Sequence, residues 1–185
     1  MANVAASARI CLIGPESTGK TELAEALARS LGLPWVPEYA REYAEAHPRE
    51  LTAADVEPIA RGQLALEDAV PPPAVLDTDL ISTVVYARYY YGECPAWIER
   101  AARDRRADLY LLCDTDIPWR ADRARSGGSA DEREEQFDAF RRALDEFEVR
   151  WTIVSGEWEE RLAAAVESCK AVKLESGGSN DTLPP

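Results

Sequence analysis

One stretch of the sequence, Gly-Pro-Glu-Ser-Thr-Gly-Lys-Thr at residues 14–21, has residue types and a spacing that suit phosphate binding. Gly14 and Gly19 allow the backbone to turn tightly, so that successive N–H groups can point at an anion. Lys20 offers a compact positive charge to the β- and γ-phosphates, and Thr21 offers a hydroxyl to Mg²⁺. The stretch therefore predicts a site for a nucleoside triphosphate, with ATP and Mg²⁺ as its ligands.

The elements expected around this stretch are those that a P-loop requires. A buried strand is expected at residues 9–13, and a helix is expected from Lys20 to about Leu31. The positive end of that helix would add to the attraction for an anion. We therefore assign the whole loop to ATP binding: Gly14, Pro15, Glu16, Ser17, Thr18, Gly19, Lys20 and Thr21.

Lysine is rare in this chain, which carries 18 Arg and three Lys. The two other lysines, Lys170 and Lys173, lie near the C-terminus. Arginine serves as the cation almost everywhere else, yet position 20 is lysine. A compact ammonium fits inside a closed phosphate loop where a broad guanidinium would not. This choice supports the P-loop assignment.

Composition limits the possible partners. A net charge of −13 argues against a surface that binds nucleic acid or an anionic membrane. No long apolar run or signal peptide is visible. Four cysteines show no metal-like spacing, and Cys11 and Cys113 lie in apolar runs, so we expect them to be buried in a protein of the reducing cytoplasm. The single His47 is expected at the surface.

The 185 residues predict one domain at 9–174, between a disordered lead at 1–8 and a disordered tail at 175–185. Short apolar runs alternate with helical patterns along this domain. The alternation predicts a doubly wound parallel α/β sheet of about five strands flanked by helices. Strands are expected at 9–13, 33–37, 74–77, 108–113 and 150–154, and helices at 20–31, from 38, and at 52–70, 80–91, 95–106, 131–147 and 157–172.

Charged side chains follow several of these strands. Ligands bind at the carboxyl ends of the strands in such sheets, so these side chains should converge on one edge. Glu38 is our candidate to contact an acceptor hydroxyl as general base. Asp77 should order Mg²⁺, although the roles of Glu38 and Asp77 could be exchanged. Asp79 shares this work, holds a ribose diol, or only caps the next helix. Arg125, then Arg123 and Arg120, would form a mobile lid over the transferring phosphoryl group.

These features narrow the class of P-loop protein. A small GTPase would need an N-K-x-D motif, which the sequence lacks, and a AAA-type motor would normally need a longer chain with a helical lid domain. Carboxylates after two strands and an arginine-rich loop after a later one are the arrangement of nucleoside and nucleoside-monophosphate kinases. We therefore expect a phosphotransferase with a nucleoside-kinase-like fold.

Four motifs carry a more specific resemblance: G-P-E-S-T-G-K-T, W-V-P-E-Y-A-R-E-Y, L-D-T-D-L-I-S-T and D-I-P-W-R-A-D-R-A-R-S. In this order they resemble the ribosylnicotinamide kinase domain of the NadR-type NAD-salvage proteins, over residues 9–172. The resemblance implies ATP-dependent phosphorylation of nicotinamide riboside to its mononucleotide by a stand-alone domain. Trp119, Asp122 and Arg125 match the lid of that family, Arg120 and Arg123 are additions, and Ala40 stands where Gly is common.

The acceptor pocket is less defined by the sequence. A cationic nicotinamide ring would favour aromatic faces and a nearby carboxylate. Tyr39, Arg41 and Tyr43 follow the second strand and are our candidates to line the pocket, whereas we expect most tyrosines of residues 86–91 in the core or at an interface. Two alternatives remain: a kinase for another nucleoside or a thiamine-like acceptor, and a non-catalytic ATP-binding regulatory module. A homo-oligomer is possible.

Overall fold

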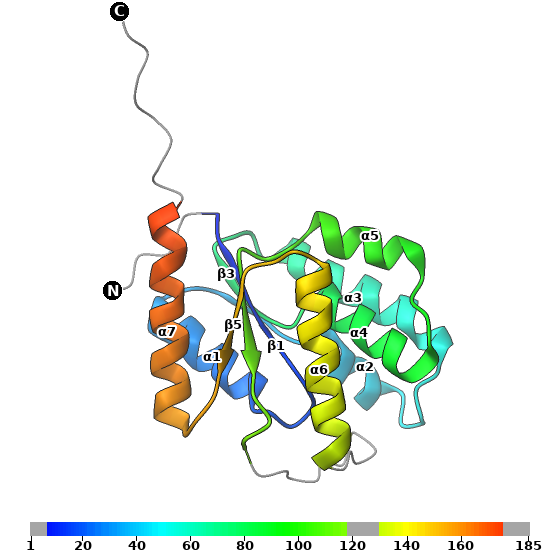
Figure 1. Ribbon diagram of the computed structural model, residues 1–185. Coiled ribbons are helices and arrows are strands. Elements are labelled where there is room, and N and C mark those ends of the chain that lie inside the picture. The colour runs from blue at the N-terminus through cyan, green and yellow to red at the C-terminus, as the bar shows by residue number, and fades with distance from the viewer. Residues whose placement is uncertain (1–6, 118–129, 176–185) are drawn as a thin grey trace, which may run out of the picture.

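The computed structural model describes residues 7–117 and 130–175, which fold around one five-stranded parallel sheet (Figure 1). The strand order is β2-β3-β1-β4-β5, so the first strand lies in the middle. The strands are β1 (Arg9–Ile13), β2 (Trp35–Val36), β3 (Ala74–Asp77), β4 (Leu109–Cys113) and β5 (Trp151–Val154). Every pairing is parallel. The predicted sheet of about five strands is confirmed.

Helices cover both faces of the sheet (Figure 1). On one face α1 (Lys20–Leu31) packs beside α7 (Trp158–Glu175). On the other face lie α3 (Val56–Ala69), α4 (Leu80–Tyr91) and α6 (Ala130–Glu146). The shorter α2 (Tyr39–Ala46) contacts α3, and α5 (Ala96–Asp104) contacts α4. The carboxyl ends of the strands meet near the start of α6.

The alternation of side chains along the central strand creates two cores. Cys11 and Ile13 face the core formed with α3, α4 and α6, whereas Ile10 and Leu12 face the core formed with α1 and α7. A strand buried on both faces reads as a continuous apolar run, as the sequence shows. Cys11 and Cys113 are both buried, as predicted.

The observed bounds depart from the predicted ones in a few places. The second strand is shorter, and the helix predicted at 52–70 begins as the 3₁₀ turn η1 (Ala53–Asp55), with Thr52 and Asp55 forming a capping box. Ala8 is buried and its carbonyl accepts a hydrogen bond from Ala74, so the ordered chain starts before the predicted boundary. The rest of the predicted lead at 1–6 and the tail at 176–185 lie outside the described residues.

Candidate nucleotide and acceptor site

The loop between β1 and α1 has a backbone that other residues would not adopt easily. Gly14 has a φ of 140°, and a Cβ there would lie 2.8 Å from the carbonyl oxygen of Cys113 at the end of β4. Gly19 has a φ of 74° and begins α1, while Ser17 also has a positive φ of 57°. Positive φ values turn successive N–H groups toward one concave side. The predicted glycine positions therefore have a structural cause.

Two side chains are held against the carbonyl oxygen of Pro15. The Thr18 hydroxyl donates to it at 2.8 Å, and the Lys20 ammonium donates to it at 2.6 Å. Lys20 is only 6% exposed. Its charge is therefore kept within the loop, close enough to Asp77 to favour the ionised carboxylate.

Asp77, at the end of β3, is 1% exposed and faces the loop. Burial, and after it the nearby Glu38 charge, raise the pKa of its carboxyl, which stands at about 6 instead of 3.8. Thr21, Lys20 and Arg41 act in the opposite direction and lower this pKa. The structure thus brings together the two carboxylates that the sequence predicted at this edge of the sheet.

The surroundings of Asp77 fit a magnesium ion. Both carboxylate oxygens are buried, and no hydrogen bond of good geometry reaches either of them from the described residues. The Thr21 side chain lies close enough to influence the carboxyl. Mg²⁺ is usually held by one or two carboxylates together with water and substrate phosphates, so a site with few protein ligands is what this ion requires. No cluster of three or more His, Cys, Asp or Glu ligands occurs within residues 7–117 and 130–175.

Asp79 differs from Asp77 in that its carboxylate oxygens accept hydrogen bonds from the protein. Its Oδ1 accepts a hydrogen bond of 2.9 Å from the N–H of Ile81 and so caps α4, while its Oδ2 accepts one of 2.6 Å from the Tyr110 hydroxyl. Both oxygens are thereby engaged inside the fold. Of the alternatives for Asp79, the geometry favours the helix cap over a substrate ligand.

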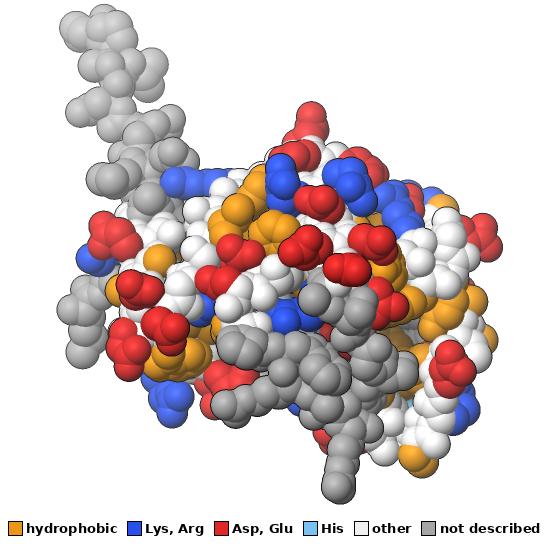
Figure 2. Space-filling model, turned by 60° about the horizontal axis from the view of Figure 1, so that its bottom comes forward, with side chains coloured by type: hydrophobic (Ala, Val, Ile, Leu, Met, Phe, Trp, Pro, Cys, Tyr) orange, Lys and Arg blue, Asp and Glu red, His pale blue; other side chains and the backbone are white. Residues whose placement is uncertain are grey.

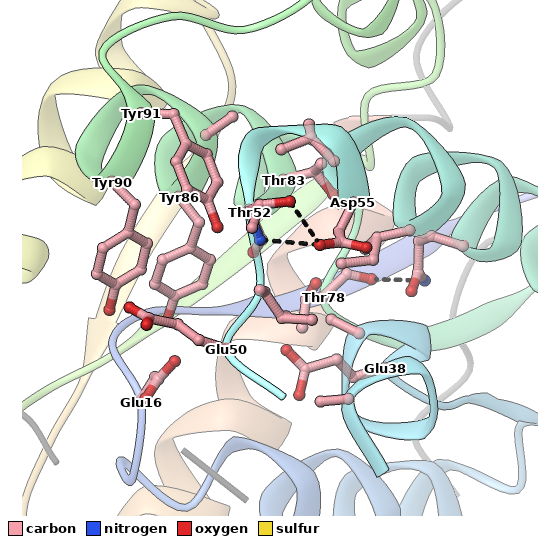
Figure 3. Close-up of a pocket in the computed structure, with 18 of the residues that line it drawn as sticks. Glu16, Glu38, Glu50, Thr52, Asp55, Thr78, Thr83, Tyr86, Tyr90 and Tyr91 are labelled. Atoms are coloured by element: carbon pink, nitrogen blue, oxygen red, sulfur yellow. Dashed lines mark hydrogen bonds between the residues drawn. The ribbon is translucent and has the colours of Figure 1, made fainter. Parts of the chain in front are cut away.

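Beside the P-loop lies a cavity of about 1030 Å³ (Figure 3). Its walls come from the P-loop, from α2 and the residue before it, from the segment that leads into α3, and from α4. This is at the upper end of the volumes that small-molecule sites occupy. Its charged and aromatic lining residues are Glu16, Glu38, Glu45, Arg49, Glu50, Asp55, Tyr86, Tyr90 and Tyr91.

Of the acceptor residues predicted after the second strand, Glu38 lines this cavity and the others do not. The Tyr39 ring packs on Gly62 of α3, where a Cβ would lie 2.0 Å from the ring. The Tyr43 hydroxyl donates to Asp55 at 2.8 Å. Arg41 lies close enough to Asp77 to lower its pKa. Tyr39 and Tyr43 thus do not line this cavity, because both side chains join α2 to its neighbours.

Tyrosines of α4, and not those of α2, line the cavity. Tyr86, Tyr90 and Tyr91 line the cavity, although we expected most of this run in the core or at an interface. The Tyr86 hydroxyl also donates to the carbonyl of Gly14 at 3.4 Å, which joins α4 to the P-loop. The spacing of Tyr86 and Tyr90, four residues apart, puts both on one helix face and was the available signal.

The far wall of the cavity is organised around Asp55, which is not among the site residues predicted from the sequence. Arg49 donates two hydrogen bonds to its carboxylate, at 2.8 and 2.7 Å, and Thr52 donates a third from its backbone N–H at 2.8 Å. These bonds hold the pKa of Asp55 well below its usual range. Asp55 is therefore ionised and fixes the segment before α3 as one side of the pocket.

Two buried arginines hold the segment that leads toward the predicted lid. Arg161 of α7 forms an ion pair with Asp116 and donates to the carbonyl of Asp114 at 3.1 Å. Arg133 of α6 donates to the carbonyls of Thr115 at 3.0 Å and Ile117 at 3.1 Å. The predicted lid residues themselves lie outside the described residues: Trp119, Arg120, Asp122, Arg123 and Arg125.

The molecular surface agrees with the overall charge. Acidic side chains are spread over the face that Figure 2 shows, with Lys and Arg side chains between them. None of the helices that the structure describes is both long enough and apolar enough to cross a membrane.

The feature that unites the site is a phosphate loop between the middle strand and the first helix, which places this protein among the P-loop nucleotide-binding α/β proteins. Comparison with protein families agrees with this class. Residues 9–161 match the family model described as AAA domain, and the chain belongs to that family. The description names a domain and not a motor activity.

Individual relatives give a narrower comparison than the family model. The chain is 28% identical over 167 residues to the trifunctional NAD biosynthesis/regulator protein NadR of Escherichia coli K12, which covers 85% of this chain and 41% of that protein. It is similar to a NadR protein solved in complex with NR, with a TM-score of 0.71, 29% identity and coverage of 97% and 54% of the two chains. A NadR protein in complex with NAD and AMP-PNP gives a TM-score of 0.69, 29% identity and coverage of 97% and 52%.

The chain thus spans about two-fifths of the length of the E. coli relative and about half of each of these structures. The resemblance predicted from the four sequence motifs is confirmed. The matched range runs from β1 into α7 and so spans the P-loop, both site carboxylates and the tyrosines of α4.

Proposed function

We propose that this protein is an ATP-dependent kinase that transfers the γ-phosphoryl group of ATP to a hydroxyl of nicotinamide riboside, giving nicotinamide mononucleotide and ADP. The observation that carries this proposal is the junction of two sites. The P-loop opens onto a cavity lined by tyrosines and carboxylates, and Glu38 and Asp77 lie where the two sites meet. An acceptor in the cavity would have its hydroxyl next to the terminal phosphate.

The residues divide the work between the two substrates. The backbone of the P-loop and the Lys20 ammonium would bind the β- and γ-phosphates and stabilise the charge that develops on the transferring group. Glu38 lines the acceptor cavity, so it is our candidate to orient the acceptor hydroxyl and receive its proton. Asp77 is deeper and is surrounded by Thr21 and Lys20, which suits it to the phosphate side.

Asp77 and Thr21 would hold Mg²⁺. When bound, this ion supplies positive charge to the phosphate oxygens and keeps them in line for transfer. The two protein groups contribute an ionised carboxylate and a hydroxyl oxygen. The burial of Asp77 and Lys20 would exclude water from the place where the terminal phosphate would lie.

The relatives support the choice of substrates. The E. coli relative is described as an NAD biosynthesis protein, and related NadR structures contain NR and the ATP analogue AMP-PNP. We extend to this chain the assignment of Arg125 and Arg123 to the ATP phosphates and of Trp119 and Asp122 to the acceptor, which rests on the motif match alone. The four free cysteines fit the reducing cytoplasm that we propose as its location.

The test is release of ADP from Mg²⁺-ATP with and without nicotinamide riboside, beside a panel of neutral nucleosides and thiamine. Strong stimulation by nicotinamide riboside supports the proposal. Stimulation by another compound would keep the kinase reaction and replace the acceptor. Tight ATP binding without stimulation by any compound would favour the regulatory module.

A further inference from the structure

The two outer edges of the sheet differ in how they are protected against pairing with a further strand. β2 forms one edge, but it has only two residues, and Pro34 and Pro37 flank it. Proline lacks the N–H group that an added strand would need, and a very short edge strand offers few groups to pair with. β5 forms the other edge with the four residues Trp-Thr-Ile-Val, none of which is charged or proline. This edge therefore has none of these protections.

The backbone of β5 directs hydrogen-bonding groups away from the sheet. The carbonyl of Val154 accepts a hydrogen bond of 3.0 Å from the N–H of Asp114, which follows β4. Alternate residues of a paired strand direct their backbone groups to the same side. Thr152 and Val154 therefore face β4, whereas the N–H and C=O groups of Trp151 and Ile153 point outward. Figure 1 shows β5 between α6 and α7, which cover opposite faces of the sheet.

The side chains at this edge are apolar and open to solvent. Three large hydrophobic side chains are exposed in the described residues, and two of them, Ile153 at 42% and Trp158 at 41%, belong to β5 and to the first residue of α7. Trp151 lies on the same face of the strand as Ile153, and its indole N–H donates to Asp145 of α6 at 3.0 Å. Apolar side chains that gather beside outward backbone groups mark a surface for another strand.

We propose that β5 pairs with β5 of a second copy of this chain, antiparallel and about a two-fold axis that passes beside Thr152. This register places Trp151 of each copy opposite Ile153 of the other, so the outward N–H and C=O groups of all four residues are paired. The aromatic and β-branched side chains then contact one another on one face of the sheet, and the two Thr152 side chains meet on the other. The two five-stranded sheets become one continuous sheet.

Charges near the two ends of β5 favour a second copy in this orientation. Arg106 is exposed and donates to the carbonyl of Phe147, which precedes the strand, at 2.9 Å. Glu157 is exposed and follows the strand. Among the described residues, neither of these two charged side chains has an ion-pair partner. Antiparallel pairing brings the start of each β5 to the end of the other, so Arg106 of one copy approaches Glu157 of its partner, whereas parallel pairing would bring like charges together.

The mass of the full chain in solution, measured by light scattering after size-exclusion chromatography, tests the pairing. At about 50 µM protein we expect a dimer of the 20.5 kDa chain. Ile153→Pro removes one outward N–H without removing a hydrogen bond to β4, and Ile153→Lys puts a charge at the edge, so each should weaken the dimer at least about tenfold. Ile153→Val keeps the edge apolar and is the matched control. Thermal unfolding of each variant verifies that it is folded.

A disulfide across the axis tests the register. Residues of an antiparallel pair that exchange no hydrogen bonds have Cα atoms about 4.5 Å apart, which a disulfide can bridge. Thr152→Cys should therefore give a covalent dimer on oxidation with diamide. Ile153→Cys would lie opposite Trp151 and diagonally from its own copy, so it should link at least about tenfold more slowly. Both variants carry Cys94→Ser, since the other three cysteines are buried.

A concentration-dependent dimer that Ile153→Lys weakens and Ile153→Val does not, together with the faster link at Thr152→Cys, would support the pairing. A wild-type protein that stays monomeric would leave this edge to a strand of a different protein and would overturn the second copy as its occupant. A dimer that neither Ile153→Pro nor Ile153→Lys weakens, or a link that forms equally fast at both cysteine positions, would overturn it as well. None of these outcomes depends on which acceptor the enzyme phosphorylates.

Discussion

The guanidinium of Arg161 donates a hydrogen bond of 3.3 Å to the carbonyl oxygen of Thr18, which lies 143 positions earlier in the chain. Arg161 is 1% exposed and also donates to the carbonyls of Gly156 at 2.9 Å and Asp114 at 3.1 Å. One side chain of the last helix therefore joins the P-loop to the segments that follow β4 and β5. The shape of the phosphate loop depends on the far end of the domain.

Replacement of Arg161 tests this connection. Arg161→Met should destabilise the protein by about 3 kcal/mol, because it leaves Asp116 and several buried carbonyls without their donor. It should also weaken ATP binding more than acceptor binding, which urea unfolding and ATP titration would measure. Arg141→Met, which removes an exposed arginine that pairs with Asp138, is the control and should change the unfolding free energy by less than about 0.5 kcal/mol. Equal losses in the two variants would contradict the structural role.

Lys20 is expected to be indispensable to turnover. Lys20→Met keeps the length of the side chain and removes the ammonium, so binding of ATP should weaken by roughly 1.5–3 kcal/mol and the transfer rate should fall further. Lys170→Met removes an exposed lysine of α7 and should have wild-type kinetics. Steady-state assays with varied ATP measure both quantities. A Lys20→Met protein with full activity would remove the P-loop from the mechanism.

Replacement of Asp77 should stabilise the fold and abolish the activity. Its pKa is raised from 3.8 to about 6, which means that the ionised carboxylate is disfavoured in the fold. Asp77→Asn should therefore raise the unfolding free energy by about 1–2 kcal/mol at pH 8 in the presence of a chelator, and should abolish Mg²⁺-dependent turnover. Thermal unfolding and a Mg²⁺ titration of activity give the two readouts. A lower melting temperature, or an unchanged titration, would argue against this description of Asp77.

Glu67 on α3 should make stability depend on pH. Its pKa stands at about 7 instead of 4.5, because burial and then the charge of Asp79 raise it by more than Arg105 and Arg9 lower it. The folded state therefore holds this proton more tightly than the unfolded state. Its stabilising effect is complete below pH 4.5 and is lost as the pH rises toward 7.

The corresponding measurement is the unfolding free energy at pH 5 and pH 8. The wild-type protein should lose about 2–3 kcal/mol more over this interval than Glu67→Gln, whose side chain does not titrate. Asp68→Asn, at the exposed neighbouring position, should behave as the wild type does. Parallel pH curves for the wild type and Glu67→Gln would show that Glu67 titrates normally.

The sequence predicted the sheet and the P-loop well because both depend on local patterns. The run from Ile10 to Ile13 is buried on both faces, and Gly14 and Gly19 have the positive φ values that their positions require. The convergence of Glu38 and Asp77 was also predictable, since strand ends in a parallel sheet meet at one edge.

The acceptor pocket was harder to predict because its walls depend on how the helices pack. Tyr39 and Tyr43 follow the second strand as expected, yet Gly62 leaves room for one ring and Asp55 accepts a hydrogen bond from the other, so both turn away from the cavity. Tyr86 and Tyr90 lie about forty residues later, and only the approach of α4 to the P-loop brings them to the site. The four-residue spacing of Tyr86 and Tyr90 predicts that they share a helix face, but no local pattern predicts which part of the fold that face meets.

The most direct test of the account is the product formed from nicotinamide riboside and ATP labelled at the γ-phosphate. Our account predicts that the label appears in nicotinamide mononucleotide in proportion to the ADP released, and that Glu38→Gln lowers this rate far more than it weakens ATP binding. Label found only in inorganic phosphate, with no mononucleotide at any acceptor concentration, would contradict the assignment of this protein as a nicotinamide riboside kinase.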